Sequence, residues 1–348
     1  MDRVFRVGLT RDFLKPDGTP GFGDIGLDLL DRAPGVEWEV LAQDTRVLRA
    51  DQVRDVDALL VLAPRVTAET LAGSDRLSII ARFGVGYDSV DVDACTRNGV
   101  LLTITPDGVR RPVATSLIAF VLALSHQLLP KDRLTRAGRW AEKADYMGMG
   151  LTGRTLGLIG VGNIGREVFR LAKPFEMRHL ACDPYVSPEA AREIGVELVD
   201  LETLLRSADF VGICCQLTPE THHLIDARKL HLMKPTAYLI NTARGPIVDQ
   251  RALTEALREG RIQGAAIDVF EEEPVDPNDP ILTLENVIVT PHAICWTDEC
   301  FLGNGRSACE SILRVAAGQL PRYVVNREVA DHPRLRARLR GYAGRVNR

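Results

Sequence analysis

Three segments of this sequence end predicted strands and carry the residue types that acid–base chemistry needs. They supply a guanidinium at Arg244, a run of carboxylates that ends at Glu273, and an imidazole at His292. The carboxyl ends of strands in a doubly wound sheet are where ligands bind. A cation can orient a substrate carboxylate, an imidazole can exchange a proton with an alkoxide, and a neighbouring carboxylate raises the imidazole pKa and fixes its tautomer. Hydride transfer between a cofactor and the C2 carbon of a 2-oxo acid requires this set.

Each of the three groups has an ordinary structural explanation when it is taken alone. Arg244 could be an ion-pair partner, the carboxylates 271–273 could form a solvated turn, and His292 could cap a strand. Three unrelated structural explanations would be needed, each for a residue that happens to follow a strand. One catalytic site explains all three positions, so the catalytic interpretation is favoured. Glu273 is predicted to be the partner of the imidazole, and the other two carboxylates of the run are the alternatives.

A glycine pattern between a predicted strand and a predicted helix indicates a dinucleotide site. The pattern is GxGxxG, and its context is the one that a dinucleotide fold requires. Gly160 permits a tight turn, Gly162 lets the backbone approach a pyrophosphate, and Gly165 lets helix and strand pack closely. The free N–H groups near Asn163 and Ile164 are expected to face the phosphates at the helix N-terminus.

The next strand ends at Asp183, eighteen residues after Gly165. A carboxylate at this position accepts hydrogen bonds from the adenosine ribose and repels a 2′-phosphate. No Arg or Lys follows in Pro184-Tyr185 to neutralise that phosphate. The sequence therefore predicts NAD rather than NADP, although an Asp at a strand end can also simply cap a turn.

Short apolar runs alternate with amphipathic helical patterns along most of the chain. This alternation predicts an α/β fold with doubly wound parallel sheets. The predicted strands are 4–9, 58–62, 78–81, 155–160, 179–183, 210–216, 237–241, 264–269 and 287–290.

A domain switch is expected in 105–111, just before the longest helical pattern, 113–128. Pro112 is expected in the first turn of this helix, where its missing N–H costs nothing. We expect a Rossmann NAD-binding domain over 108–298, inserted into a flavodoxin-like substrate domain made of 1–107 and 299–330. An Arg-rich tail, 331–348, is expected to be a solvated and partly mobile helix.

Composition excludes several classes of protein. The 348 residues are 45% hydrophobic and 26% charged, with a net charge of −4, which fits a globular chain and disfavours a nucleic-acid partner. No apolar run approaches a membrane span, and the N-terminus lacks the layout of a signal peptide. The seven cysteines form no CxxC pair. We therefore expect a cytoplasmic protein with reduced thiols and no metal.

As a set, these motifs resemble the D-isomer-specific 2-hydroxyacid dehydrogenases, a family that includes 3-phosphoglycerate dehydrogenase and the hydroxypyruvate/glyoxylate reductases. The resemblance runs from about Val4 to Asn326. It is carried by the segments 83–88 (FGVGYD), 160–165, 241–249 (NTARGPIVD), 268–274 and 291–292.

The resemblance implies a reaction, an assembly and a set of site residues. The inner domain of the family binds NAD, the outer domain closes over the substrate, and the enzymes are usually homodimers built through the inner domains. The implied catalytic residues are Arg244, Glu273 and His292. The implied ligand contacts are Thr242, Ala243 and Asp268 on the cofactor, with Asp268 at the nicotinamide carboxamide, and the backbone of Val85 and Gly86 on the substrate carboxylate.

Two departures from the family pattern affect the substrate. The segment after the catalytic imidazole carries Trp296 where the family usually has small residues, and Thr115 stands where Glu is common. We expect the indole of Trp296 to contact the substrate and to favour one larger than glyoxylate. Arg110 and Arg111 are either a solvated pair at the hinge or a site for a second anionic group of the substrate.

Other functions on the same scaffold remain open at this point. An NADH-sensing corepressor retains the catalytic trio, and a phosphite dehydrogenase shares it. Formate enzymes of the superfamily carry Gln where Glu273 stands, which argues against that branch.

Overall fold

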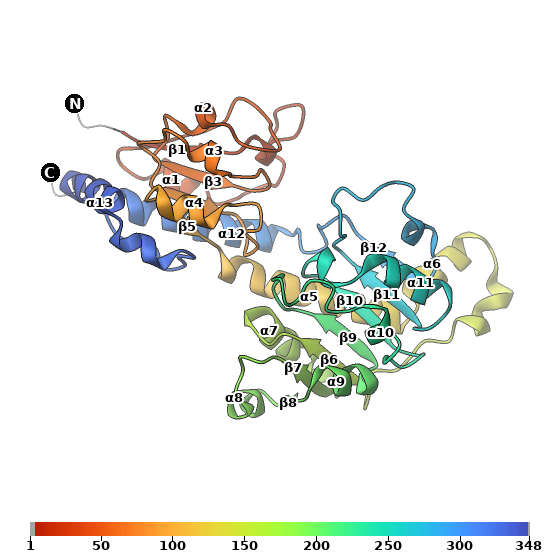
Figure 1. The fold of residues 1–348 in the computed structure, drawn as a ribbon. Helices are drawn as coiled ribbons and strands as arrows, with labels where there is room; N and C mark the ends of the chain where they lie inside the picture. The colour runs from red at the N-terminus through yellow and green to blue at the C-terminus, as the bar shows by residue number, and fades with distance from the viewer. Residues whose placement is uncertain (1–3, 347–348) are drawn as a thin grey trace. The chain divides into compact units, whose positions relative to one another are not determined.

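The computed structural model describes residues 4–346 (Figure 1). Residues 1–3 and 347–348 lie outside the described residues. They include the start of the N-terminal segment that was expected to lack a signal-peptide layout, and the last Arg of the predicted tail. The chain divides into two compact units. Unit 1 comprises Met1–Val109 and Trp296–Arg348, and unit 2 comprises Arg110–Cys295.

Unit 1 is built on a five-stranded sheet in which every pairing is parallel. Its strands are β1 (Phe5–Leu9), β2 (Val36–Val40), β3 (Ala58–Val61), β4 (Ile79–Arg82) and β5 (Leu101–Thr103), in the order β2-β1-β3-β4-β5. Its helices are α1 (Asp28–Asp31), α2 (Ala50–Val53), α3 (Ala68–Leu71), α4 (Val92–Arg97), α12 (Asp298–Ala316) and α13 (Pro333–Val346), with 3₁₀ turns η1 (Arg11–Phe13) and η6 (Arg327–Asp331). Every residue of the central strand β3 is fully buried, as expected for a strand covered on both faces.

Unit 2 is built on a seven-stranded sheet, again with parallel pairings throughout. Its strands are β6 (Thr155–Ile159), β7 (Arg178–Cys182), β8 (Glu197–Leu198), β9 (Phe210–Ile213), β10 (Tyr238–Asn241), β11 (Gly264–Ile267) and β12 (Val287–Val289), in the order β12-β11-β10-β9-β6-β7-β8. The helices are α5 (Pro106–Ser125, which begins in unit 1), α6 (Leu128–Arg136), α7 (Asn163–Ala172), α8 (Pro188–Glu193), α9 (Leu201–Ser207), α10 (Ala227–Leu230) and α11 (Gln250–Arg258). The 3₁₀ turns are η2 (Trp140–Tyr146), η3 (Lys173–Phe175), η4 (Gly245–Ile247) and η5 (Pro280–Thr283).

Alternate residues of the unit 2 strands enter two separate cores. In β10, Leu239 packs on one face of the sheet and Ile240 on the other, as a period of two requires. The strand order reverses between β6 and β9, and such a switch point is where doubly wound sheets bind ligands. The two strand orders confirm the predicted fold class, a Rossmann sheet in unit 2 and a flavodoxin-like sheet in unit 1.

The predicted start of the long helix is wrong. Helix α5 begins at Pro106, not after Pro112, and Pro112 lies in its interior. Pro106 occupies the first helical position, where proline is well tolerated, and Pro112 costs the helix a single hydrogen bond to the carbonyl of Gly108. By length and composition alone α5 is apolar enough to span a membrane, but 61% of its most apolar stretch is buried and it forms part of the unit 2 core.

The described part of the Arg-rich tail forms the predicted helix, but this helix is packed on unit 1 rather than fully solvated. Helix α13 is docked in unit 1 through Leu335, which is fully buried, and Tyr342, whose hydroxyl lies 2.9 Å from Ser78 Oγ. The Arg338 guanidinium donates to the carbonyls of Leu77 and Gly99 at 2.6 and 3.0 Å. In the sequence the tail is dominated by arginines, yet its few apolar residues recur at helical spacing and pack on unit 1.

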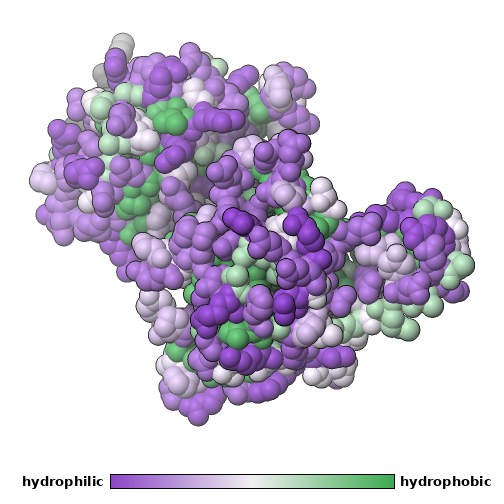
Figure 2. All heavy atoms as spheres, turned by 45° about the vertical axis from the view of Figure 1, so that its right-hand side comes forward, coloured by the Kyte–Doolittle hydropathy of each residue, from purple (hydrophilic) through white to green (hydrophobic). Residues whose placement is uncertain are grey.

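The face of the molecule seen in Figure 2 is mainly hydrophilic, with small, separated apolar groups.

Candidate active site

The turn that follows β12 holds His292 in an uncommon conformation. The residue has a φ of 54°, in the left-handed region, and its N–H donates to the carbonyl of Asp268 at 2.7 Å. The buried Asp268 carboxylate fixes the turn because its Oδ1 accepts from Thr290 Oγ1 (2.5 Å) and from the N–H groups of Ala293 (2.9 Å) and Ile294 (3.1 Å). Backbone strain of this kind persists only where the surroundings enforce it, and it is concentrated at functional sites.

Glu273 is the carboxylate that pairs with this imidazole. Its Oε2 lies 2.7 Å from Nδ1 of His292, and its Oε1 accepts from the N–H of Phe270 at 3.0 Å. Burial by itself would raise the pKa of Glu273, but the hydrogen bond and charge of His292, the Phe270 N–H and the Arg244 charge together lower it. The carboxylate is therefore ionised at neutral pH, and its contact with Nδ1 leaves Nε2 as the nitrogen for proton exchange.

The turn after β10 carries Arg244 and lies directly against the loop of Glu273. Asn241 cross-links this turn, since its Oδ1 accepts from the N–H of Ala243 (3.0 Å) and its Nδ2 donates to the carbonyl of Arg244 (2.9 Å). A Cβ at Gly245 would lie only 1.8 Å from the Phe270 carbonyl oxygen, so this close approach of two backbones requires glycine. The structure thus brings the predicted guanidinium, carboxylate and imidazole together at one edge of the unit 2 sheet.

A second His–Glu pair at this edge was not found from the sequence. The ring of His223 pairs through Nε2 with Glu271, and the N–H of His223 donates to the carbonyl of Pro246 at 2.8 Å. The ring also stacks on His222 with centroids 4.1 Å apart. The pair ties the loop after β9 to the loop of Glu273. The adjacent histidines were the available signal, but nothing in a linear sequence indicates which of three carboxylates each one meets.

The glycine turn has the form that a dinucleotide needs. Helix α7 begins at Asn163, directly after Gly162, so the first N–H groups of the helix face outward from its N-terminus. A Cβ at Gly162 would meet no atom within 4 Å, which leaves open space beside those donors, whereas at Gly165 it would meet the Gly160 carbonyl oxygen at 2.4 Å. The N–H donors of the helix, the open space beside Gly162 and the close packing at Gly165 together fit the pyrophosphate of NAD.

Asp183 follows β7 beside the glycine turn. Its Oδ2 accepts from the N–H of Val161 at 2.7 Å and its Oδ1 from the N–H of Tyr185 at 2.9 Å. The turn-capping alternative therefore holds in the structure. The contacts leave the predicted role in cofactor binding open, because a carboxylate has about four lone-pair sites and two are used here.

We expect Asp183→Ala to weaken the preference for NADH over NADPH by roughly 10-fold, the value of one lost hydrogen bond to a charged group. The measurement is kcat/KM with both cofactors. Glu189→Ala, at an exposed carboxylate of α8, is the matched control and should leave the ratio unchanged. Equal efficiency of wild-type enzyme with NADPH would contradict the role of Asp183.

Three of the predicted substrate residues, Val85, Gly86 and Trp296, belong to unit 1, whereas Arg244 belongs to unit 2. The loop after β4 contains the partly exposed residues Val85 and Gly86, whose N–H groups have no hydrogen-bond acceptor among residues 4–346. Trp296 is the first residue of the second segment of unit 1. In unit 2, Arg111 forms an ion pair with Glu167 at 3.0 Å, so the structural explanation applies to this arginine.

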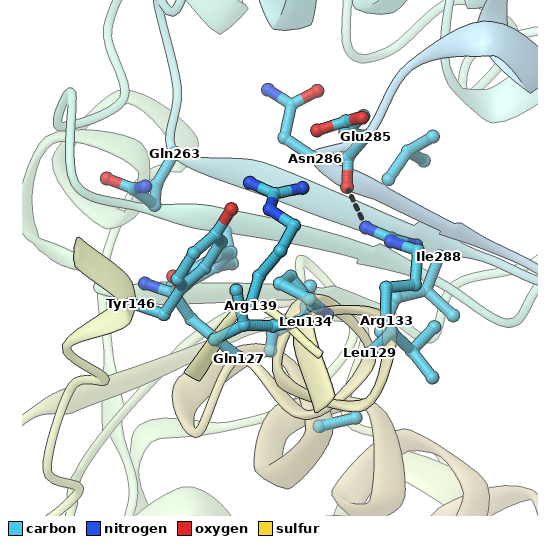
Figure 3. A pocket seen from close by; sticks show the side chains of 15 residues that line it. Gln127, Leu129, Arg133, Leu134, Arg139, Tyr146, Gln263, Glu285, Asn286 and Ile288 are labelled. Carbon is cyan, nitrogen blue, oxygen red and sulfur yellow. Dashed lines mark hydrogen bonds between the residues drawn. The ribbon is translucent and has the colours of Figure 1, made fainter. Parts of the chain in front are cut away.

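The pocket in Figure 3 lies in unit 2, at the edge of the sheet opposite to the segments of Arg244, Glu273 and His292. It has a volume of about 270 Å³ and is lined by residues at the amino ends of β10, β11 and β12, among them Tyr238, Gln263 and Val287. The catalytic segments follow the carboxyl ends of the same strands. In the part of the chain that is described, we find no group of three or more His, Cys, Asp and Glu side chains that could hold a metal ion.

A Rossmann unit with a cofactor turn and an Arg–Glu–His edge defines an NAD-dependent oxidoreductase. Residues 118–293 match the family model of the D-isomer specific 2-hydroxyacid dehydrogenase, NAD binding domain. The chain belongs to this family, as the resemblance predicted, and it interconverts a 2-hydroxy acid and its 2-oxo acid with NAD. The alternative of a corepressor is not favoured.

Known relatives and structures are similar over almost the whole chain. A glyoxylate reductase from Korarchaeum cryptofilum is 39% identical over 84% of this chain and 89% of its own length. The TT0316 protein from Thermus thermophilus has a TM-score of 0.81 at 33% identity, covering 92% of this chain and 100% of that one. A D-lactate dehydrogenase from Aquifex aeolicus, solved with NAD and lactic acid, has a TM-score of 0.80 at 27% identity, covering 92% and 99%.

Proposed function

We propose that His292 is the acid–base residue of this oxidoreductase, that Glu273 orients it, and that Arg244 binds the substrate. The observation that carries the proposal is the 2.7 Å contact between the Glu273 carboxylate and Nδ1 of His292, beside the turn of Arg244. A His–carboxylate pair next to a guanidinium suits a substrate that carries both a carboxylate and a carbonyl.

The roles of the side chains follow from this geometry. The bound nicotinamide supplies or accepts the hydride. In the reductive direction Nε2 of His292 gives its proton to the C2 oxygen of the substrate, and in the oxidative direction it takes that proton back. The ionised Glu273 holds Nδ1–H, which keeps the exchangeable proton on Nε2. The guanidinium of Arg244 orients the substrate and polarises the carbonyl as negative charge develops on its oxygen.

Ligand contacts are divided between the two units in this proposal. Unit 2 holds NAD through the glycine turn and Asp183, with Thr242, Ala243 and Asp268 at the nicotinamide end. Unit 1 holds the substrate carboxylate through the N–H groups of Val85 and Gly86, which lack acceptors among the described residues. The observed units, which divide after Val109 and after Cys295, would then be the substrate domain and the NAD-binding domain.

The reaction is tested by following NADH oxidation with a series of 2-oxo acids and determining the configuration of the product. We expect turnover of one or more of these acids to the D-2-hydroxy acid. The relatives named glyoxylate reductases make glyoxylate the reference substrate of the series. Tight NADH binding without turnover of any 2-oxo acid would contradict the proposal. The next assay would then measure NAD-dependent oxidation of phosphite, the reaction of the alternative phosphite dehydrogenase.

Glu273→Gln should change the pH dependence in a defined direction. The pKa of the wild-type carboxylate is lowered, so it is ionised through the neutral range and stabilises a protonated imidazole. The neutral amide removes the negative charge that contacts Nδ1 of His292, and the acidic limb of the kcat/KM profile for oxidation is expected to move to lower pH. Glu271→Gln, on the same loop, is the control. If the profile of Glu273→Gln overlies that of wild type, Glu273 is not the partner that matters.

We also propose a cytoplasmic homodimer formed through unit 2. Exposed apolar side chains gather in the segment that contains α6 and η2, where Trp140 is 66% and Met147 is 81% exposed. This segment also lines the pocket of Figure 3, in which Arg139 and Tyr146 lie side by side. A second copy of the chain would cover these residues. All seven cysteines are free, as expected in a reducing compartment.

A Trp140→Ser/Met147→Ser variant is expected to sediment as a monomer under conditions where wild type sediments as a dimer. Leu320→Ser changes an exposed apolar residue of unit 1 and serves as the control. A double variant that remains dimeric would place the interface elsewhere.

A further inference from the structure

Five aromatic side chains of unit 1 pack ring against ring. Phe22 stacks on Phe301 with centroids 4.2 Å apart, and Trp296 meets both rings edge-on at 5.1 and 5.4 Å. Phe83 lies 5.4 Å from Phe301 and 5.1 Å from Phe13. We call this group the aromatic cluster. It joins the loop after β1, the end of β4 and the start of α12.

The cluster is fixed to the loop whose N–H groups are proposed to bind the substrate carboxylate. Phe83 directly precedes Gly84, and Gly84 exchanges two hydrogen bonds with Thr105, at 2.8 and 2.9 Å. The Thr105 hydroxyl donates to Asn304 at 2.6 Å, one helical turn after Phe301. Each of these polar groups is buried and paired, so the start of the loop is tied to α12 beside Phe301.

One side of the cluster is closed and the other is open. Phe83 and Phe301 are buried, whereas Trp296 is 48% exposed and Phe22 is partly exposed. Phe22 reaches this place because the chain around it folds back, with the N–H of Gly21 donating to the carbonyl of Phe13 at 2.9 Å. The cluster includes Phe83, which lies two residues before Val85. An exposed aromatic surface on this cluster suits a ligand that has an anionic end and an apolar end.

We propose that Phe22 and Trp296 form the specificity surface for the C3 substituent of the substrate, and that the preferred substrate is a 2-oxo acid with an aromatic or branched apolar side chain. This inference rests on the proposed function, in which the N–H groups of Val85 and Gly86 hold the carboxylate. An apolar C3 group would then cover the open rim of the cluster. Glyoxylate has no C3 atom and gains nothing from this surface. The pairing of Arg111 with Glu167 removes one of the two arginines that a second anionic group could have used.

The experiment compares glyoxylate, pyruvate, 4-methyl-2-oxopentanoate and phenylpyruvate with NADH. For wild type we expect kcat/KM to rise with the apolar size of the C3 group and to be at least about 10-fold higher for phenylpyruvate than for glyoxylate, because the transfer of apolar area from water increases. Trp296→Ala and Phe22→Ala are each expected to lower kcat/KM for phenylpyruvate by roughly 10-fold, mainly through KM, and to change the value for glyoxylate by less than about 3-fold.

Two further variants keep the result interpretable. Trp296→Phe retains a ring and should keep most of the preference, while Val47→Ala removes apolar surface that is exposed elsewhere in unit 1 and should change nothing. Glyoxylate as the best substrate of wild type, or an equal loss for both substrates in Trp296→Ala and Phe22→Ala, overturns the inference while the proposed reaction stands. Failure of wild type to reduce any member of the series overturns the proposed reaction itself.

Discussion

His292→Ala is expected to lower kcat by roughly 10²–10⁴-fold in both directions of the reaction, the usual loss when a general acid or base is removed. The imidazole is the group whose Nδ1 is engaged by the Glu273 carboxylate at 2.7 Å, which directs the other ring nitrogen to proton exchange. Glu273 and Arg244 cannot supply this proton in its place, because Glu273 is acceptor-only when ionised and Arg244 does not release a proton. The measurement is the steady-state rate at saturating NADH and 2-oxo acid.

Binding of NADH should remain close to that of wild type in this variant, because the glycine turn and Asp183 lie on other elements of unit 2. Fluorescence titration of NADH checks this point. His231→Ala changes an exposed histidine on the end of α10 and controls for a general effect of losing an imidazole. If His292→Ala retains more than about a tenth of the wild-type kcat while His231→Ala is unaffected, another group must exchange the proton.

The sequence predicts well that Arg244, Glu273 and His292 lie at one edge of the sheet, because each belongs to a contiguous motif at a strand end. A parallel sheet places all carboxyl ends of its strands on one side, so Arg244, Glu273 and His292 had to be neighbours once the strands were recognised. The same logic covers the glycine turn and Asp183. What the motifs could not assign was the pairing inside the run 271–273. In the structure Glu273 pairs with His292, and Glu271 pairs with His223.

The features that escaped prediction depend on contacts between distant parts of the chain. Phe22 lies in an irregular loop without a periodic pattern, and its partner Phe301 is far away in the sequence. Strand β2 was missed because its alternating glutamates and partly buried residues are typical of an exposed edge. The docking of α13 depends on Leu335 and Tyr342, two apolar residues among many arginines. In each case the structure depends on which distant element covers the residue. The local sequence pattern does not contain this information.

Arg244→Ala is expected to lower kcat/KM for the best 2-oxo acid by roughly 30- to 5,000-fold, since removal of one partner of a buried charged pair costs about 2–5 kcal/mol. The guanidinium stands on a turn that Asn241 cross-links and that Gly245 brings against the Glu273 loop, so the backbone of Arg244 is held beside the His–Glu pair. Arg244→Lys keeps the charge but loses the planar fork that matches a carboxylate, and it should fall between wild type and the Ala variant.

The two variants separate binding from polarisation. A guanidinium that only anchors the substrate carboxylate would raise KM and leave kcat unchanged, whereas one that also stabilises charge on the C2 oxygen must lower kcat as well. We expect both constants to change in Arg244→Ala, with partial recovery of kcat when guanidinium ion is added. Arg251→Ala, at an exposed arginine of α11, is the matched control. Wild-type kcat/KM in Arg244→Ala would exclude this residue from the substrate site, and a loss confined to KM would leave carbonyl polarisation to His292.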